Sequence, residues 1–374
     1  MADKVRIGVA GTSWWADSMY LPAISTHPLA DVRAVAGTRP EHTREFAATW
    51  GIPAAYDTVE AMLEAEPLDA VIVATPNKSH FPIAHAALER GLHVLCEKPV
   101  GMNSSEARVL ADLAAAKGLT TMVPFTYKNM PGMRYLKELV DEGYIGDPYH
   151  LNMRYFAGYG RDGAYAWRFD LDVAGAALSG DLGSHLAYLA RWYFGEVESV
   201  TAEFGLSVPR ANRPDGSDYP RGEDSAIILL RFANGATGSL HVSSVAHEPS
   251  SFGQVHGVEL HGSRGTLHHV NDWDRVQTVS GARADDDAVR NLPIPDRCWG
   301  GAPRDDAHET YKHVFRHQET QARAFVSAVA AGRPVEPDLA DGLAVQRIVD
   351  AAVRSAREGR RVSIAEIAAD EVVP

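Results

Sequence analysis

The chain has 374 residues, more than one hydrophobic core usually serves, so we expect two domains. Hydrophobic residues make up 45% and charged residues 23%, both ordinary for a soluble globular protein. A net charge of -13 disfavours phosphate backbones and anionic lipid as partners, so we predict neither nucleic acid nor a membrane. With two cysteines, no basic-then-apolar leader and no apolar run near ~18 residues, the chain is predicted to be cytoplasmic.

The first third alternates short apolar runs with helix-like segments. Strands are predicted at residues 5–10, 32–36, 70–74, 93–96 and 121–124, and helices at 43–50, 59–64, 83–90 and 105–117. A strand–helix–strand rhythm predicts a parallel sheet with helices on both faces. Residues 1–125 are therefore predicted to form a doubly wound, Rossmann-type domain of the α/β class.

A glycine-containing turn, "GVAGTSWWADS" at residues 8–18, follows the first strand and opens a helix, as a dinucleotide-binding fingerprint requires. Gly11 keeps the tight turn, Ser13 stands where a second glycine is usual, and Ala16 is small enough for the helix to pack on the strand. The N–H groups at the start of the helix would face a phosphate. The alternative is an ordinary strand–helix turn.

The residues after the second strand predict which nicotinamide cofactor is preferred. An acidic side chain there would hydrogen-bond a ribose 2′-hydroxyl, whereas an arginine without that acid leaves room for a 2′-phosphate. The stretch reads Ala36-Gly37-Thr38-Arg39-Pro40 and contains no acid. We therefore predict NADP(H) over NAD(H).

Two further motifs follow the next strands, "ATPNKSH" at residues 74–80 and "LCEKPVG" at residues 95–101. Open α/β sheets bind ligands outside the carboxyl ends of their strands, so Lys98 is expected to face the ligand.

After about residue 125 the rhythm changes. Helices are predicted at residues 133–142, 181–194, 309–331 and 341–358, and strands at 149–159, 199–208, 225–232, 236–246, 255–260 and 266–269. Consecutive strands joined by tight turns predict an open, mostly antiparallel sheet. Residues 126–374 are thus predicted to form a second, α+β domain for substrate binding and oligomerisation, with loops at 209–224 and 281–307.

The predicted helix that begins at residue 181 carries "GDLGSHLAYLARW", residues 180–192. Asp181 and His185 are four residues apart and therefore share one helical face. Taken alone, such a pair is also compatible with a solvated surface.

Together, the motifs around Lys98 and on this helix resemble those of the Gfo/Idh/MocA family of oxidoreductases, which includes glucose–fructose oxidoreductase and inositol dehydrogenase. The likeness runs from Val5 to "EGRRVSI", which ends at Ile364. It implies hydride transfer between a nicotinamide and a hydroxyl or keto carbon of a sugar, inositol or related polyol. It also implies a homodimer or homotetramer and a cis Lys98–Pro99 bond.

The resemblance gives Lys98 and Asp181 the tasks of binding the reacting oxygen and holding the substrate. Hydride transfer also needs a base for the alcohol proton, and an imidazole, with an ordinary pKa of ~6.5, suits that task. The sequence does not decide whether Lys98 or His185 takes the proton; we favour His185.

Fifteen residues are expected to bind the dinucleotide: Gly11, Thr12, Ser13, Trp14, Trp15, Thr38, Arg39, Thr75, Pro76, Asn77, His80, Glu97, Lys98, Trp167 and Arg168. Five are expected to bind the substrate: Tyr155, Tyr159, Arg168, Asp181 and His185. Flat aromatic faces with a few polar groups suit a polyol ring, although exposed sheet aromatics also serve subunit interfaces.

Two other functions compete with this one. A dinucleotide-binding regulator without turnover has no need of Lys98, Asp181 and His185 together, whereas a reductase of an imine or a dihydrodiol could use all three. The 16 histidines predict no metal site, because "HETYKH" at residues 308–313 misses the H-E-x-x-H spacing by one residue. His313 and His317 are suitably spaced but lack a third ligand.

Overall fold

The computed structural model describes residues 4–371 and divides them into two compact units. The first unit comprises residues 4–124 and 312–344, and the second comprises residues 125–311 and 345–371. The chain passes from one to the other within helices α10 (Ala307–His317) and α12 (Leu339–Glu358). The sequence predicted one cut after residue 125. The structure differs from that prediction by giving residues 312–344 to the first unit.

The first unit contains a six-stranded sheet in the order β3-β2-β1-β4-β5-β6, with all neighbours parallel. Its strands are β1 (Val5–Ala10), β2 (Ala30–Ala36), β3 (Ala54–Tyr56), β4 (Ala70–Val73), β5 (His93–Cys96) and β6 (Thr121–Met122). Its helices are α1 (Leu21–Ser25), α2 (Pro40–Trp50), α3 (Val59–Ala65), α4 (His80–Glu89), α5 (Ser104–Lys117) and α11 (Gln321–Ala330). This strand order reverses beside β1 and is that of dinucleotide-binding domains.

Helix α11 explains why residues 312–344 belong to the first unit. Phe325 and Val326 are fully buried in the same apolar cluster as Val9 and Ile72 of the parallel sheet. Backbone contact continues the attachment, because the N–H of Val123 donates to the carbonyl of Pro337 at 2.8 Å. This late segment therefore completes the core of a domain that begins at the N-terminus.

The helix predicted at residues 309–331 is in fact two helices, α10 and α11. The break falls at residues 318–320, where Thr320 is extended with a φ of -130° and a ψ of 156°, and α11 then begins at Gln321, which has a φ of 45°. Residue periodicity does not detect such a break, since both helices are amphipathic.

The second unit contains a nine-stranded sheet in the order β14-β13-β12-β11-β7-β10-β9-β8-β15. Its strands are β7 (Pro148–Ala157), β8 (Val197–Gly205), β9 (Ser225–Phe232), β10 (Thr237–Ser243), β11 (Gln254–Gly262), β12 (Gly265–Asn271), β13 (Thr278–Arg283), β14 (Arg290–Leu292) and β15 (Val362–Ser363). Its remaining helices are α6 (Pro131–Asp141), α7 (Leu171–Ala174), α8 (Ser184–Phe194), α9 (Asp296–Trp299) and α13 (Ile364–Ala369). The β7–β10 pair is parallel and its neighbours are antiparallel, as the predicted mostly antiparallel sheet requires.

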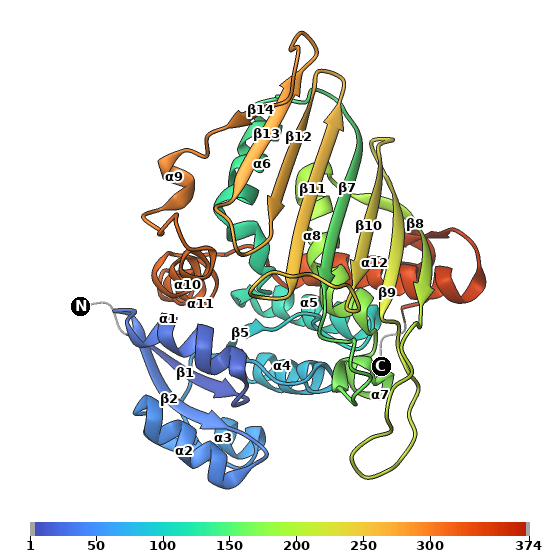
Figure 1. Cartoon of the computed structure of the whole chain (residues 1–374). Helices are drawn as coiled ribbons and strands as arrows, with labels where there is room; N and C mark the ends of the chain where they lie inside the picture. Colours follow the sequence, from blue (N-terminus) through green and yellow to red (C-terminus); the bar gives the residue numbers. More distant parts are fainter. Residues whose placement is uncertain (1–3, 372–374) are drawn as a thin grey trace. The chain divides into compact units, whose positions relative to one another are not determined.

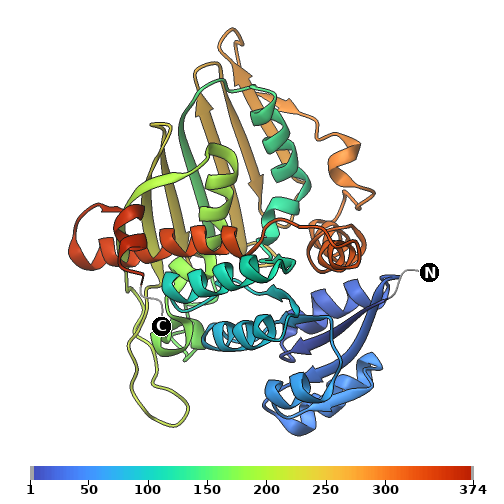
Figure 2. The ribbon, with the colours of Figure 1, turned by 180° about the vertical axis from the view of Figure 1, so that it is seen from behind.

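Helices α6 and α8 cover one face of this sheet and leave the other open, as the opposite views of Figures 1 and 2 show. Strand β9 follows that division residue by residue, because Ile228 and Leu230 are buried while Ile227 and Leu229 are 46% and 50% exposed.

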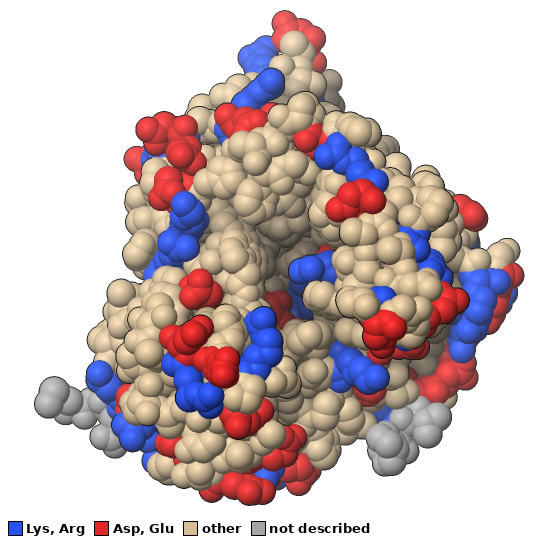
Figure 3. Space-filling view, turned by 60° about the horizontal axis from the view of Figure 1, so that its bottom comes forward, with Lys and Arg blue, Asp and Glu red and all other residues tan. Residues whose placement is uncertain are grey.

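No helix among residues 4–371 is long and apolar enough to cross a membrane. On the face shown in Figure 3, lysine and arginine side chains are interspersed with aspartate and glutamate.

Candidate functional site

The turn after β1 is shaped so that only glycine fits. Gly11 has a φ of 101°, and a Cβ built on it would lie 2.4 Å from the carbonyl oxygen of Ala74 at the end of β4. The chain therefore passes close to the neighbouring strand at the edge where a pyrophosphate binds in this fold.

A short helical segment follows this turn and begins at Trp14, directly after Ser13. The Ser13 hydroxyl accepts the N–H of Ala16 at 3.2 Å, and residues Ala16–Tyr20 form a π-helix ahead of α1. Trp14 is 59% exposed, whereas Trp15 packs edge-on against the buried ring of Tyr20. Of the two tryptophans in the sequence motif, Trp14 is the more accessible to a ligand.

The residues that follow β2 are accessible to a ligand. Thr38 and Arg39 are both exposed, and Arg39 directly precedes α2, which starts at Pro40.

The loops after β4 and β5 are tied together by His80. This side chain is buried, with Nε2 2.8 Å from the carbonyl oxygen of Thr75 and Nδ1 2.6 Å from that of Pro99. Burial lowers the pKa of His80, although the two carbonyls oppose that shift. His80 thus links the two loops. Asn77 is also buried, whereas the neighbouring Thr75 and Pro76 are more accessible.

Lys98 follows β5 and is partly buried, and its peptide bond to Pro99 is cis, as predicted. The preceding residue, Glu97, accepts a hydrogen bond from the hydroxyl of Tyr20. The glycine turn, Arg39, Thr75 and Lys98 all follow the carboxyl ends of neighbouring parallel strands, and the cradle at Gly11 fits a dinucleotide.

In the second unit, Asp181 is the centre of a polar cluster. The hydroxyl of Tyr159 donates to its Oδ2 at 2.9 Å, and Nε of Arg168 lies 3.2 Å from the same oxygen. The Arg168 guanidinium also stacks on Trp167, 4.7 Å from the ring centre. Three of the predicted residues, Tyr159, Arg168 and Asp181, are therefore in direct contact.

The helix that carries Asp181 and His185 is not uniform. The sequence predicted one α-helix over residues 181–194, but Ser179–Gly183 form a π-helix and α8 begins at Ser184. A π-turn is wider than an α-turn and is often found at functional sites. His185, the second residue of α8, is 7% exposed.

Aromatic side chains surround His185. Its ring meets Tyr127 edge-on, with centres 4.8 Å apart, and the Tyr127 hydroxyl lies 2.8 Å from that of Tyr155. Tyr155 in turn donates to the side-chain oxygen of Gln254 at 2.6 Å, so the Tyr127 proton is directed toward Tyr155. Tyr155, predicted as a substrate-binding residue, is therefore connected to His185 through Tyr127.

Buried His256 closes the cluster beneath the two tyrosines. Its ring centre lies 4.3 Å from that of Tyr127 and 4.1 Å from that of Tyr155, and burial lowers its pKa to about 3. It is therefore a neutral imidazole. The sequence did not identify Tyr127, Gln254 or His256, because each lies in a strand or turn without a motif.

The six-strand order and the glycine turn define the first unit as the dinucleotide-binding domain of an oxidoreductase. Residues 5–125 match the model of an oxidoreductase family with an NAD-binding Rossmann fold, and residues 133–268 match the GFO/IDH/MocA C-terminal domain. These matches span more than half of the chain. The chain belongs to the GFO/IDH/MocA family of oxidoreductases, which confirms the resemblance seen in the sequence.

Known relatives extend over nearly the whole length. Levoglucosan dehydrogenase of Pseudarthrobacter phenanthrenivorans is 28% identical over 363 residues, covering 90% of each chain. D-xylose 1-dehydrogenase (NADP(+)) 2 of Haloferax volcanii is 28% identical over 363 residues, covering 96% of this chain and 100% of the relative. A structure of levoglucosan dehydrogenase with NADH and L-sorbose superimposes with a TM-score of 0.86 at 26% identity, covering 98% of this chain and 100% of the other.

Replacing Gly11 tests the dinucleotide site. Because a non-glycine residue at positive φ costs about 1–3 kcal/mol and the new methyl would meet the Ala74 carbonyl, we expect Gly11→Ala to weaken NAD(P)H binding about tenfold or more. The measurement is a titration of nucleotide fluorescence. Gly51→Ala is the matched control, since Gly51 has a φ of 63° with open space around it. Equal affinity in the two variants would contradict this assignment.

Proposed function

We propose that the chain is an NAD(P)-dependent dehydrogenase or reductase that acts on a hydroxyl or keto carbon of a sugar, inositol or related polyol. The observation that carries the proposal is the cluster in which Tyr159 and Arg168 hold Asp181, four residues from the buried imidazole of His185. A carboxylate and hydroxyls beside aromatic faces suit a ring with several hydroxyl groups. The names of the relatives, which are sugar dehydrogenases, support the same substrate class.

Each of the three central residues has a task in this mechanism. A nicotinamide supplies the chemistry of hydride acceptance or donation at C4 of its ring. His185 takes the proton of the substrate hydroxyl in oxidation and returns it in reduction. The ammonium of Lys98 stabilises the negative charge that develops on the reacting oxygen, and Asp181 accepts hydrogen bonds from a substrate hydroxyl.

We favour NADP(H) as the cofactor. Thr38 and Arg39 are exposed after β2 and no acid lies between Ala36 and Pro40, which suits a 2′-phosphate. The relatives include both cofactors, since the Haloferax volcanii enzyme is named for NADP(+) and the levoglucosan dehydrogenase structure contains NADH.

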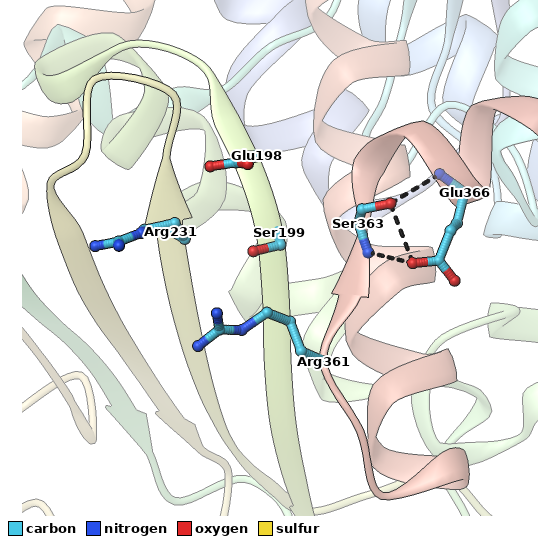
Figure 4. A pocket seen from close by; sticks show the side chains of 6 residues that line it. All are labelled: Glu198, Ser199, Arg231, Arg361, Ser363 and Glu366. Atoms are coloured by element: carbon cyan, nitrogen blue, oxygen red, sulfur yellow. Dashed lines mark hydrogen bonds between the residues drawn. The ribbon is translucent and has the colours of Figure 1, made fainter.

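We also propose that the chain forms a homodimer or homotetramer through the open face of its nine-stranded sheet. Ile227 and Leu229 of β9 give this face exposed apolar side chains, and Arg231 lies next to them on the same strand. Figure 4 shows a hollow at the β8 side of the sheet, where Arg231 and Arg361 extend beside Ser199. Exposed apolar side chains bordered by polar ones are typical of subunit interfaces.

The two cysteines, Cys96 and Cys298, are buried and not joined in a disulfide, which supports our proposal of a reducing, cytoplasmic compartment.

The first prediction from the proposed function concerns turnover. A screen of sugars, inositols and their keto forms, followed by NAD(P)H absorbance, is expected to find a substrate. Lys98→Ala and His185→Ala should each lower kcat about 10²–10⁴-fold, as loss of an acid–base or charge-stabilising group does, while nucleotide binding persists. Lys117→Ala and His85→Ala serve as controls for each residue type. Near-normal turnover in either site variant would refute the mechanism, and tight nucleotide binding without any substrate would favour a regulator.

The second prediction concerns cofactor preference. A charge-assisted hydrogen bond contributes about 1.5–3 kcal/mol, so Arg39→Ala should reduce the ratio of kcat/KM for NADP(H) over NAD(H) by about tenfold or more. Arg44→Ala, on the exposed side of the same helix α2, should leave the ratio unchanged. A wild-type preference for NAD(H) would overturn the assignment.

The third prediction concerns assembly. Leu229→Arg places a charge among the exposed apolar side chains of β9 on the open face and should shift the sedimenting species toward one chain. Val289→Arg, at a site that is 53% exposed in the turn before β14, should keep the wild-type mass. If Leu229→Arg sediments like the wild type, the open face is not the interface.

A further inference from the structure

The loop between β8 and β9, residues 206–224, packs against two segments: the one that carries Tyr159 and Arg168, and the π-helix that carries Asp181. We propose that this loop is a positioning element of the site, in which Arg213 and Glu223 keep Asp181, Tyr159 and Arg168 in their mutual arrangement for substrate binding. This inference rests on the proposed function, since it assigns these residues to the substrate side of the same site.

The strongest contact of the loop is between Arg213 and Asp170. Nε and Nη2 of Arg213 bind the two carboxylate oxygens of Asp170 at 2.7 and 2.9 Å, and Nη2 also binds Asp172 at 2.6 Å. Asp170 is fully buried, and the guanidinium holds its pKa below the usual range. Because Asp170 lies two residues after Arg168, this two-point contact limits how far Arg168 can move.

Arg210 reinforces the same segment from the side. Its buried guanidinium lies 3.3 Å from the ring centre of Phe169, and the Phe169 ring lies 6.0 Å from that of Tyr159. Two backbone hydrogen bonds tie the segment to the loop, from Ala211 to the carbonyl of Gly163 and from Gly222 to that of Phe169, each at 2.9 Å. The stretch that carries Tyr159 and Arg168 is thereby fixed along its length.

The end of the loop holds the other partner. The buried carboxylate of Glu223 accepts the N–H of Ser179 at 2.7 Å, at the first residue of the π-helix that contains Asp181. Gly222 packs so closely that a Cβ there would lie 2.2 Å from Cβ of Ala177. The same loop thus contacts the segment that carries the donors Tyr159 and Arg168 and the π-helix that carries the acceptor Asp181.

This double attachment has a chemical consequence. The hydrogen bond from Tyr159 and the ion pair from Arg168 both reach Oδ2 of Asp181, so a small shift of either segment changes which carboxylate positions remain for a substrate hydroxyl. A buried group that acts through another side chain affects ligand binding by orienting it. Loosening the loop should therefore weaken sugar binding and leave nucleotide binding to the first unit as it is.

The test compares steady-state kinetics and nucleotide affinity in Arg213→Met and Arg213→Lys. Arg213→Met should raise the KM for the best substrate of the wild type about tenfold, less than the ~100-fold that a 1 Å misplacement of reacting groups can cost. The Kd for NAD(P)H should stay at its wild-type value. Arg213→Lys keeps the charge without the two-point geometry, so its KM should lie between those of the wild type and Arg213→Met.

Two further variants separate positioning from stability. Asp170→Asn combined with Arg213→Met removes both charges, so that no buried carboxylate is left unpaired if the single variant folds poorly. Arg354→Met is the matched control, because Arg354 is 24% exposed, as against 25% for Arg213, and binds Asp370 at 2.6 Å. A variant that merely loses stability should lower kcat through fewer folded molecules at an unchanged KM.

The outcomes are distinct. A raised KM with unchanged nucleotide affinity in Arg213→Met or the double variant, and not in Arg354→Met, supports the proposal. If the wild type is active, and Arg213→Met and the double variant have the same KM as Arg354→Met, the proposal is overturned. If the wild type turns over no sugar or polyol, the proposed function itself has failed.

Discussion

The carboxylate of Asp181 is the group on which the arrangement of the second unit depends. Its side chain is 19% exposed, so it needs donors in place of the water it has lost, and Tyr159 and Arg168 supply them. These donors come from the segment after β7, whereas Asp181 comes from a π-helix. The two segments must therefore be held at a fixed position relative to each other. The ion pair between Arg213 and Asp170 and the hydrogen bond of Glu223 meet that requirement at positions remote in sequence.

The first unit meets a comparable requirement at the edge of its parallel sheet. The loops after β4 and β5 leave the sheet side by side, and buried His80 joins the carbonyls of Thr75 and Pro99. Lys98 therefore stands on a loop that His80, from the neighbouring loop, holds through the carbonyl of Pro99. In both units, buried polar side chains hold the segments that carry the expected ligand-binding residues: His80 in the first unit, and Asp170 and Glu223 in the second.

Local sequence was sufficient to predict a large part of this molecule. The strand and helix rhythm of the first 125 residues, the turn at Gly11 and the cis bond at Lys98 depend on neighbouring residues and agree with the structure, except that the short strand β3 at Ala54–Tyr56 was not predicted. The family was recognised from motifs of the same local kind. The contact of Asp181 with Tyr159 and Arg168 was predicted only as a shared site, since no spacing rule joins residues 159, 168 and 181.

Other features depended on tertiary packing and could not be predicted in this way. The pattern of α11 is the same whichever sheet it covers, so the sequence assigned it to the adjacent domain. Tyr127, Gln254 and His256 come together from a turn and one end of β11, without any motif. The segment 209–224 was correctly predicted as a loop, but its charged residues gave no sign that Arg213 would bind a fully buried aspartate.

The discontinuity of the first unit constrains how the chain reaches its native state. During synthesis, residues 4–124 leave the ribosome long before α11, so Val9, Ile72 and their neighbours have an uncovered apolar surface until Phe325 arrives. The intervening residues, which carry strands β7 to β14, can form most of their own sheet in that interval, because domains generally fold as units in order of emergence. The nucleotide-binding unit is thus begun first but completed only after residues 312–344 have emerged, and a truncated product ending before residue 312 would carry the motif of the cofactor site on an unfinished core.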